Sequence, residues 1–344
     1  MSHAALVRAF AIAAFSLCFV VVVLGAYVRL SAAGLGCPDW PGCYGHLTPT
    51  GAAAALNSSP AGASTPATPA RVNVGKAWRE MIHRYAASTL GLLVVCLTAM
   101  AIAWRRERVL PILYMLALLG AVTLQGALGM LTVTWQLRPL IVTGHLLFGL
   151  LTLSLLWWLV LTLLRRGGGA WGSHPAFLGS AVRRTRQLAL LGLAALLLQI
   201  ALGGWTSSNY AATACPDLPT CQGSWWPPAD FEAGFVLWRG LDINYEGGVL
   251  ANPARVAIQV THRLGALLAT LALLAAVIAA LRYRYDQLAR RAALFVLAAL
   301  LLQLCIGLAM VLRGFPLWLA TAHNAGAALL LLAAVALNRA LRPA

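Results

Sequence analysis

Eight long apolar stretches dominate the sequence and limit what the chain can fold into. They run over residues 9–28, 80–104, 109–134, 139–164, 187–207, 256–281, 292–312 and 317–337. About 20 apolar residues cross the hydrocarbon core of a bilayer as an α-helix, and a helix pairs all its backbone groups within itself. The stretches therefore predict an all-α integral membrane protein with eight transmembrane helices.

Composition supports this fold class. Charged residues make up 10% of the chain, against about 25% in a typical soluble domain. This value excludes a water-soluble enzyme, a disordered chain and a small disulfide-stabilised protein. A cleavable signal peptide is the alternative for the first stretch, because Ser31-Ala32-Ala33 is small enough for a cleavage site. The stretch is too long for a typical signal sequence, and the repeat described below requires it.

The segments between the stretches alternate in charge. The N-terminus, residues 105–108, 165–186 and 282–291, and the C-terminus carry fifteen arginines and two acids, a net charge of +13, whereas the remainder carries +3. Basic residues concentrate on the cytoplasmic side of membrane proteins. We therefore expect a multi-pass protein of a bacterial-type inner membrane, with both termini cytoplasmic and loops 30–78 and 208–255 outside. The net charge of +16 indicates loops against anionic membrane lipid, not nucleic-acid binding.

The chain contains an internal repeat with an offset of 178 residues. The matching landmarks are Leu24-Gly25 with Leu202-Gly203, Cys37-x5-Cys43 with Cys215-x5-Cys221, Leu124-Gln125-x3-Gly129 with Leu302-Gln303-x3-Gly307, and His145 with His323. His83-Arg84 matches His262-Arg263 at 179. Four helices separate the copies, so both copies have the same orientation. We predict two tandem parallel four-helix bundles, at 1–166 and 187–344, joined by a cytoplasmic linker at 167–186.

Four of the seven histidines fall within apolar stretches: His83, His145, His262 and His323. Each is expected in the first two turns of an even-numbered helix on the outer side, so each unit has two at similar depth. A lone buried histidine is usually a hydrogen-bonded core residue, but a repeated pair is typical of a functional site. Zinc and copper normally take three or four protein ligands. Two histidines in apolar surroundings favour a haem iron bound on both faces.

Arg84 and Arg263 directly follow the second-helix histidine of each unit. A guanidinium group near the headgroup region can bind a haem propionate, because it recognises carboxylates through two parallel hydrogen bonds. The alternative is that both side chains extend to the membrane interface without binding a cofactor.

The two Cys-x5-Cys pairs, Cys37 with Cys43 and Cys215 with Cys221, lie in loops assigned to the outer, oxidising side. This setting favours a short disulfide in each loop. Metal binding is the alternative, although Cys-x2-Cys spacing is more usual for it. Such a disulfide would brace its loop or undergo redox chemistry.

The repeat is broken at one position near the histidines. Glu80 stands three residues before His83, on the same helix face, whereas Gln259 stands three residues before His262. An acid beside a metal ligand in one unit only predicts acid–base chemistry there and a plain cofactor site in the other. The alternative is an interfacial acid that balances a neighbouring arginine.

Together these features resemble the haem A synthase family, over essentially the whole chain. The residues that carry the resemblance are Glu80-x-x-His83-Arg84, His145, His262-Arg263, His323 and both cysteine pairs, within a 4+4 helix repeat. Some members of that family lack the loop cysteines, so this chain resembles the cysteine-bearing type.

The resemblance implies an enzyme that oxidises a ring methyl group of haem O to a formyl group by successive hydroxylations, giving haem A for terminal oxidases. It implies that His83, His145 and Arg84 bind haem O, with Glu80 as the catalytic residue, and that His262, His323 and Arg263 bind a haem b cofactor. Haem O synthase, terminal-oxidase assembly factors and an unidentified electron donor are the implied partners.

Two other functions fit the same histidines: a two-haem electron-transfer protein of cytochrome b type, and a haem transporter or chaperone. The presence of Glu80 in the first unit and Gln259 at the matching position of the second favours the enzyme over these two functions. Electron transfer alone gives no reason for a carboxylate in one unit only.

Overall fold

The computed structural model describes residues 2–58, 72–107, 110–166, 180–240, 242–282 and 287–342. Eight of its helices are long and apolar enough to cross a membrane: α1 (His3–Leu30), α3 (Val74–Ala103), α4 (Ile112–Thr134), α5 (Pro139–Arg166), α6 (Ser180–Ser208), α8 (Asn252–Arg282), α9 (Gln287–Leu312) and α10 (Leu317–Ala340). Two short helices, α2 (Pro49–Ser58) and α7 (Phe231–Gly234), lie in the long loops. Within the described ranges there is no β-strand, so the expected all-α membrane fold is confirmed.

Several helices begin earlier than the apolar stretches. Polar residues such as Lys76 and Arg255 continue α3 and α8 beyond the apolar part. As a result His83 is the tenth residue of α3 and His262 the eleventh of α8, about three turns in, so the expectation of the first two turns was wrong for both. α6 begins at Ser180, inside the expected linker. The unit boundaries at 166 and 187 stay a prediction.

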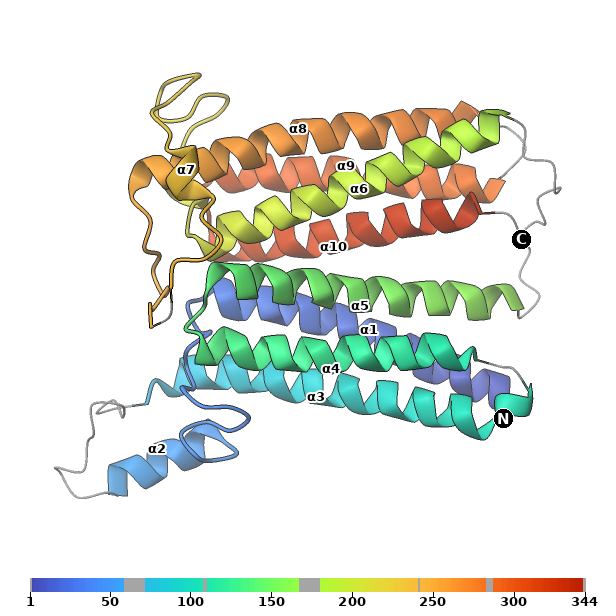
Figure 1. The fold of residues 1–344 in the computed structure, drawn as a ribbon, viewed down its shortest axis with the longest axis horizontal. Helices are drawn as coiled ribbons and strands as arrows, with labels where there is room; N and C mark the ends of the chain where they lie inside the picture. The colour runs from blue at the N-terminus through green and yellow to red at the C-terminus, as the bar shows by residue number, and fades with distance from the viewer. Residues whose placement is uncertain are drawn as a thin grey trace.

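The long helices form two sets of four. In the first set α1 contacts α3 and α5, and α4 contacts the same two helices; in the second set α6 contacts α8 and α10, and α9 contacts the same two. Figure 1 shows the first set in blue to green and the second in yellow-green to red. In each set, therefore, the second and fourth helices lie diagonally across a four-helix ring.

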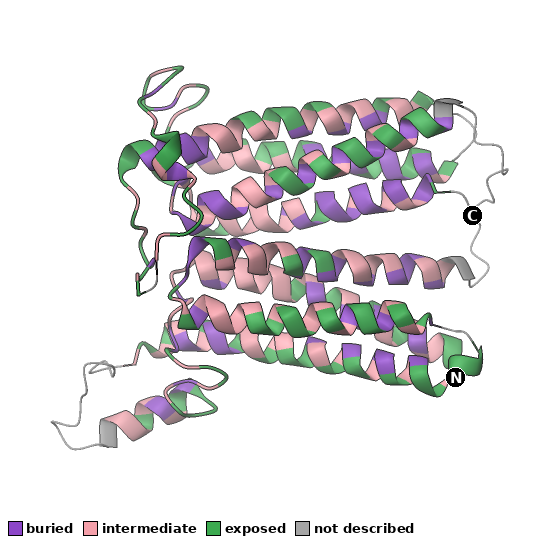
Figure 2. Cartoon of the chain, viewed as in Figure 1, coloured by how far each residue is buried: buried purple, intermediate pink, exposed green. Residues whose placement is uncertain are grey.

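The two sets meet along α1 and α5 on one side and α6 and α10 on the other. The indole N–H of Trp157 on α5 donates to the carbonyl of Leu332 on α10 (3.1 Å), and Phe15 of α1 stacks on the same indole. A single cluster of buried apolar residues runs through both sets. The burial pattern in Figure 2 accordingly places the buried residues mainly on facing helix surfaces.

The outward surfaces of the long helices are apolar. Leu113, Leu198, Leu268 and Phe295 are each more than 60% exposed. An apolar surface of this extent is not stable in water, so these faces contact lipid.

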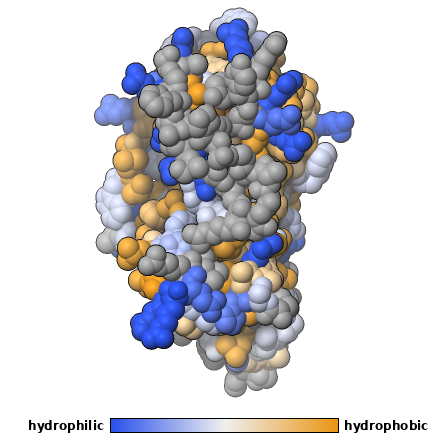
Figure 3. All heavy atoms as spheres, turned by 90° about the vertical axis from the view of Figure 1, so that its right-hand side faces the viewer, coloured by the Kyte–Doolittle hydropathy of each residue, from blue (hydrophilic) through white to orange (hydrophobic). Residues whose placement is uncertain are grey.

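Both ends of the chain lie at one end of the molecule, and the long loops lie at the other (Figure 1). Hydrophilic side chains gather on the face that carries the termini (Figure 3). Exposed arginines at these helix ends include Arg105, Arg183, Arg282 and Arg290. This distribution fits a cytoplasmic face, and the sidedness itself stays a prediction.

The loop end joins the two sets by polar contacts. The guanidinium of Arg138, next to the start of α5, lies over the rings of Trp135 and Trp238 and donates to the carbonyl of Gly240. Arg29 of α1 donates to the carbonyl of Ser207 on α6 (2.9 Å). The loop between α7 and α8 therefore contacts the loop end of the first set.

Candidate functional site

The four membrane histidines lie on the diagonal helices of the two sets. His83 is on α3 and His145 on α5, while His262 is on α8 and His323 on α10. His145 lies close enough to His83 for an electrostatic interaction between the two side chains. His262 and His323 lie within the same kind of range of each other. The structure thus brings the histidines together in the two expected pairs, each across one four-helix ring.

A glycine on the other diagonal faces each histidine ring. A Cβ atom added to Gly25 would lie 2.9 Å from His83 Cε1, and one added to Gly129 would lie 3.2 Å from His145 Cε1. In the second set, a Cβ atom added to Gly203 would lie 3.2 Å from His262 Cε1, and one added to Gly307 would lie 3.2 Å from His323 Cε1. Any larger residue at these positions pushes the ring out of place, because cores tolerate little overpacking.

Glutamine side chains contact three of the four histidines. Gln125 donates from Nε2 to the carbonyl of His145 (2.9 Å), and Gln199 donates to the carbonyl of His262 (3.0 Å). Gln303 Nε2 lies 3.3 Å from both ring nitrogens of His323. Gln125 and Gln303 had served only as landmarks of the repeat, and Gln199, whose repeat-equivalent residue is Val21, had not been identified.

The two cysteine loops have the same internal structure. A disulfide joins Cys37 to Cys43, with the Cα atoms 4.7 Å apart, and another joins Cys215 to Cys221, at 4.6 Å. The carboxylate between each pair accepts two backbone N–H groups beyond the second cysteine: Tyr44 and Gly45 for Asp39, and Gln222 and Gly223 for Asp217.

The carboxylate of Asp217 is stabilised as an anion. The hydroxyl of Thr220 and the N–H of Gly223 lower its pKa to about 2. The acid therefore stays charged at neutral pH and keeps its turn closed.

Arg84 and Arg263 tie these loops to the histidine helices. Arg84 Nη1 donates to the carbonyls of Asp39 (2.9 Å) and Gly42 (2.5 Å). Arg263 donates to the carbonyls of Asp217 (2.8 Å) and Thr220 (2.7 Å), the repeat-equivalent positions. A further contact of either arginine with a haem carboxylate stays a prediction.

Glu80 is the buried polar group that distinguishes the first site. It is 4% exposed; one oxygen accepts from Arg84 (2.5 Å) and the other from the N–H of Cys37 (2.9 Å). Gln259 is equally buried in the second set, but its Oε1 has no hydrogen-bond partner. Glu80 thus lies one turn from His83 and directly beneath the first disulfide loop.

The donor set fits a haem iron. In the described part of the chain, no group of three or more His, Cys, Asp or Glu side chains is arranged to hold a metal ion. Each set instead contains a pair of imidazoles, and a glycine on a neighbouring helix faces each ring. Nδ1 of His83 and of His145 is buried without a hydrogen bond, and a buried polar atom of this kind calls for a partner. Two nitrogen ligands in an apolar bundle are the set that a haem takes.

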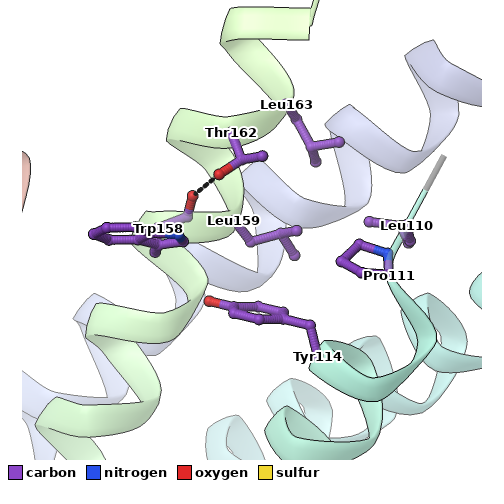
Figure 4. A pocket seen from close by; sticks show the side chains of 7 residues that line it. All are labelled: Leu110, Pro111, Tyr114, Trp158, Leu159, Thr162 and Leu163. Carbon is purple, nitrogen blue, oxygen red and sulfur yellow. Dashed lines mark hydrogen bonds between the residues drawn. The ribbon is translucent and has the colours of Figure 1, made fainter. Parts of the chain in front are cut away.

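A small apolar hollow of about 90 Å³ lies between the start of α4 and the end of α5 (Figure 4). It is lined by Leu110, Pro111, Tyr114, Trp158, Leu159, Thr162 and Leu163. Trp158 is thirteen residues beyond His145 on α5, about 20 Å along the helix at 1.5 Å per residue. The hollow is therefore separate from the histidine sites.

The fold and the site together define an eight-helix membrane protein with one pair of buried histidines in each four-helix set. The chain belongs to the cytochrome oxidase assembly protein family, whose profile it matches over residues 8–335. It is 41% identical over 320 residues to the heme A synthase of Shewanella oneidensis, covering 92% of this chain and 91% of that protein. It is 29% identical to the heme A synthase of Granulibacter bethesdensis, covering 96% and 86%. The expected resemblance to the haem A synthase family is confirmed.

We predict that both loop disulfides are present in the membrane-inserted protein. Alkylation of the denatured, unreduced protein should modify Cys18, Cys96 and Cys305, which are free in the structure, and leave the four loop cysteines unmodified. Mass spectrometry of the peptides measures this, and the three free thiols serve as the internal control. Alkylation of all four loop cysteines before reduction would contradict the prediction.

We also predict that Gly307→Val lowers the haem content of the second set. The added methyl groups would displace His323. Overpacking costs about 1–3 kcal/mol, and about 1.4 kcal/mol is a tenfold change in binding, so haem retention should fall about tenfold. The pyridine haemochrome assay measures it. Gly126→Val on α4 is the matched control, because a Cβ there meets nothing within 4 Å. Equal haem content in both variants would refute the role of the glycine.

Proposed function

We propose that the protein is a haem A synthase, which oxidises a methyl group of haem O to a formyl group. The main support for this proposal is the buried carboxylate of Glu80, which lies beside one of two otherwise matching histidine pairs. A protein that only relays electrons needs two matching sites and has no use for this difference. Relatives named heme A synthase, similar over more than nine-tenths of the chain, support the proposal.

In this proposal the first set binds haem O between His83 and His145. The second set binds haem b between His262 and His323 as the resident cofactor. When bound, the haem groups supply the redox chemistry at iron. Arg84 and Arg263 hold the disulfide loops over the outer ends of the two sites, and this cover limits the access of water.

Conversion of a methyl to a formyl group is a four-electron oxidation; with the added oxygen atom counted as water, it releases four electrons and four protons. Two successive hydroxylations achieve this, because the resulting gem-diol loses water to give the aldehyde. Each hydroxylation therefore transfers protons within the site. Glu80 is placed to accept them, since a carboxylate can act as a general base, and Arg84 and the N–H of Cys37 hold it in one orientation.

The electron donor and the source of oxygen lie outside these residues. We propose an inner-membrane location with both termini in the cytoplasm and the disulfide loops outside, supported by the arginines at the terminal end and the preference for basic residues inside. The chemistry places the protein after an enzyme that makes haem O and before a terminal oxidase that takes haem A.

Pigment analysis of the purified protein tests the function. We expect haem b together with haem O, its alcohol derivative or haem A, each identified by chromatography and mass. His262→Ala and His323→Ala should each remove the low-spin haem b spectrum, because a haem iron held on two faces loses one ligand. Haem b alone in both sets would favour an electron-transfer protein, and unchanged spectra in both variants would remove the assignment of the second site.

Glu80→Gln is the decisive test within the first set. It should retain haem b and bound haem O, but produce haem A about 10²–10⁴ times more slowly, because an amide cannot take up a proton. Conversion of haem O, followed by chromatography, measures the loss. Gln259→Ala, at the equivalent position of the second set, is the control and should be mild. Near-normal haem A production by Glu80→Gln would reduce this acid to a support for the disulfide loop.

A further inference from the structure

Three of the four histidines are held by a glutamine that lies in a notch made by a glycine. Gln199 Nε2 lies 3.1 Å from His262 Nδ1. A Cβ added to Gly265, one turn after His262, would clash with Gln199 Oε1. The glutamine therefore reaches the imidazole only because residue 265 has no side chain.

The same construction holds the two histidines of the fourth helices. A Cβ on Gly149 would lie 3.0 Å from Nε2 of Gln125, and one on Gly326 would clash with Oε1 of Gln303. In all three cases the amide Oε1 is buried without a hydrogen-bond partner. An amide can turn either end toward a ring nitrogen, so each glutamine has an acceptor available for an imidazole N–H.

The fourth position departs from this pattern. The repeat places Val21 where the second set has Gln199, and Ala86 where it has Gly265. Both members of the pair have changed together: the amide is absent and the notch is filled. The backbone of Val21 is a hydrogen-bonding partner of the His83 ring, so a main-chain contact stands where the second set has a glutamine side chain, and His83 Nδ1 is buried without a hydrogen bond.

From this difference, and resting on the proposed function, we infer that Gln199 and Gly265 lock His262 as a permanent haem ligand, whereas Val21 and Ala86 leave His83 as the ligand that can release the iron. Gln125 contacts the backbone carbonyl and Nε2 of His145, although Nδ1 of that ring has no hydrogen bond. The substrate haem therefore keeps one ligand with a glutamine contact and one ligand without it. The resident haem keeps two fixed ligands.

The chemistry of the two sites requires this difference. A haem that only passes electrons stays bound on both faces, whereas a haem whose iron takes part in oxygen chemistry needs an open position. Hydrogen bonds to the far nitrogen of a ligating histidine fix the ring and its tautomer, and removing them weakens metal affinity by about 10–100-fold. Gln199 is thus a positioning residue, which acts through His262.

A reciprocal exchange tests the inference with the purified full-length protein. Gln199→Val with Gly265→Ala gives the second set the pair of the first. We expect the reduced resident haem to bind carbon monoxide, which a haem with two fixed ligands does not, and to pass to excess apomyoglobin about tenfold faster or more. Both are read from optical spectra.

Val21→Gln with Ala86→Gly is the matched control in the opposite direction. With protohaem added as the probe, the first set should bind less carbon monoxide than in the unmodified protein. Opposite effects from the same four residues exclude general destabilisation. If the first double variant does not accumulate, Gln199→Leu removes the amide and still fills the notch.

Unchanged carbon monoxide binding and unchanged haem loss in both Gln199 variants would overturn the inference. Failure of this inference can be distinguished from failure of the proposed haem site. Absence of haem from the unmodified second set, or full retention in His262→Ala, would overturn the assignment of the site itself.

Discussion

The close contact between each histidine ring and a glycine on the neighbouring helix sets the geometry on which both sites depend. The ring lies where a side chain of the next helix would otherwise stand, so the helices approach closely and the imidazoles point into the bundle. Small residues allow close helix packing in membranes, where the hydrophobic effect no longer drives helices together. Because the contact recurs four times, the two four-helix sets share one site geometry.

Against this common frame, the differences between the sets gather around one imidazole. Glu80 in place of Gln259, Val21 in place of Gln199 and Ala86 in place of Gly265 all lie near His83 or its counterpart His262. One change adds a charged group and the other two remove a support. A membrane interior makes an unsatisfied polar group costly, and Glu80 is kept there by Arg84 and the first disulfide loop.

The sequence predicted the eight helices, the histidine pairs and the cysteine pairs well, because hydrophobic length is a local property and the repeat is found by comparing the sequence with itself. It misplaced the starts of α3 and α8, since an amphipathic helix continues beyond the hydrocarbon and hydropathy does not mark its end. Nothing in the sequence indicated that Gly265 and Gly326 make room for glutamine side chains. The contact of Arg138 with Trp238 joins residues far apart in the chain, and only the tertiary structure reveals it.

The seam between the two sets has a consequence for the movement of electrons. One continuous apolar core crosses it, a hydrogen bond joins Trp157 to Leu332 across it, and Arg29 and Arg138 join the two sets at the loop end. Densely packed interiors have low compressibility and transmit strain, so the two sets do not slide past each other. Haem groups on either side would keep a constant separation throughout turnover, and electron transfer between them would require tunnelling across a fixed gap with no docking step.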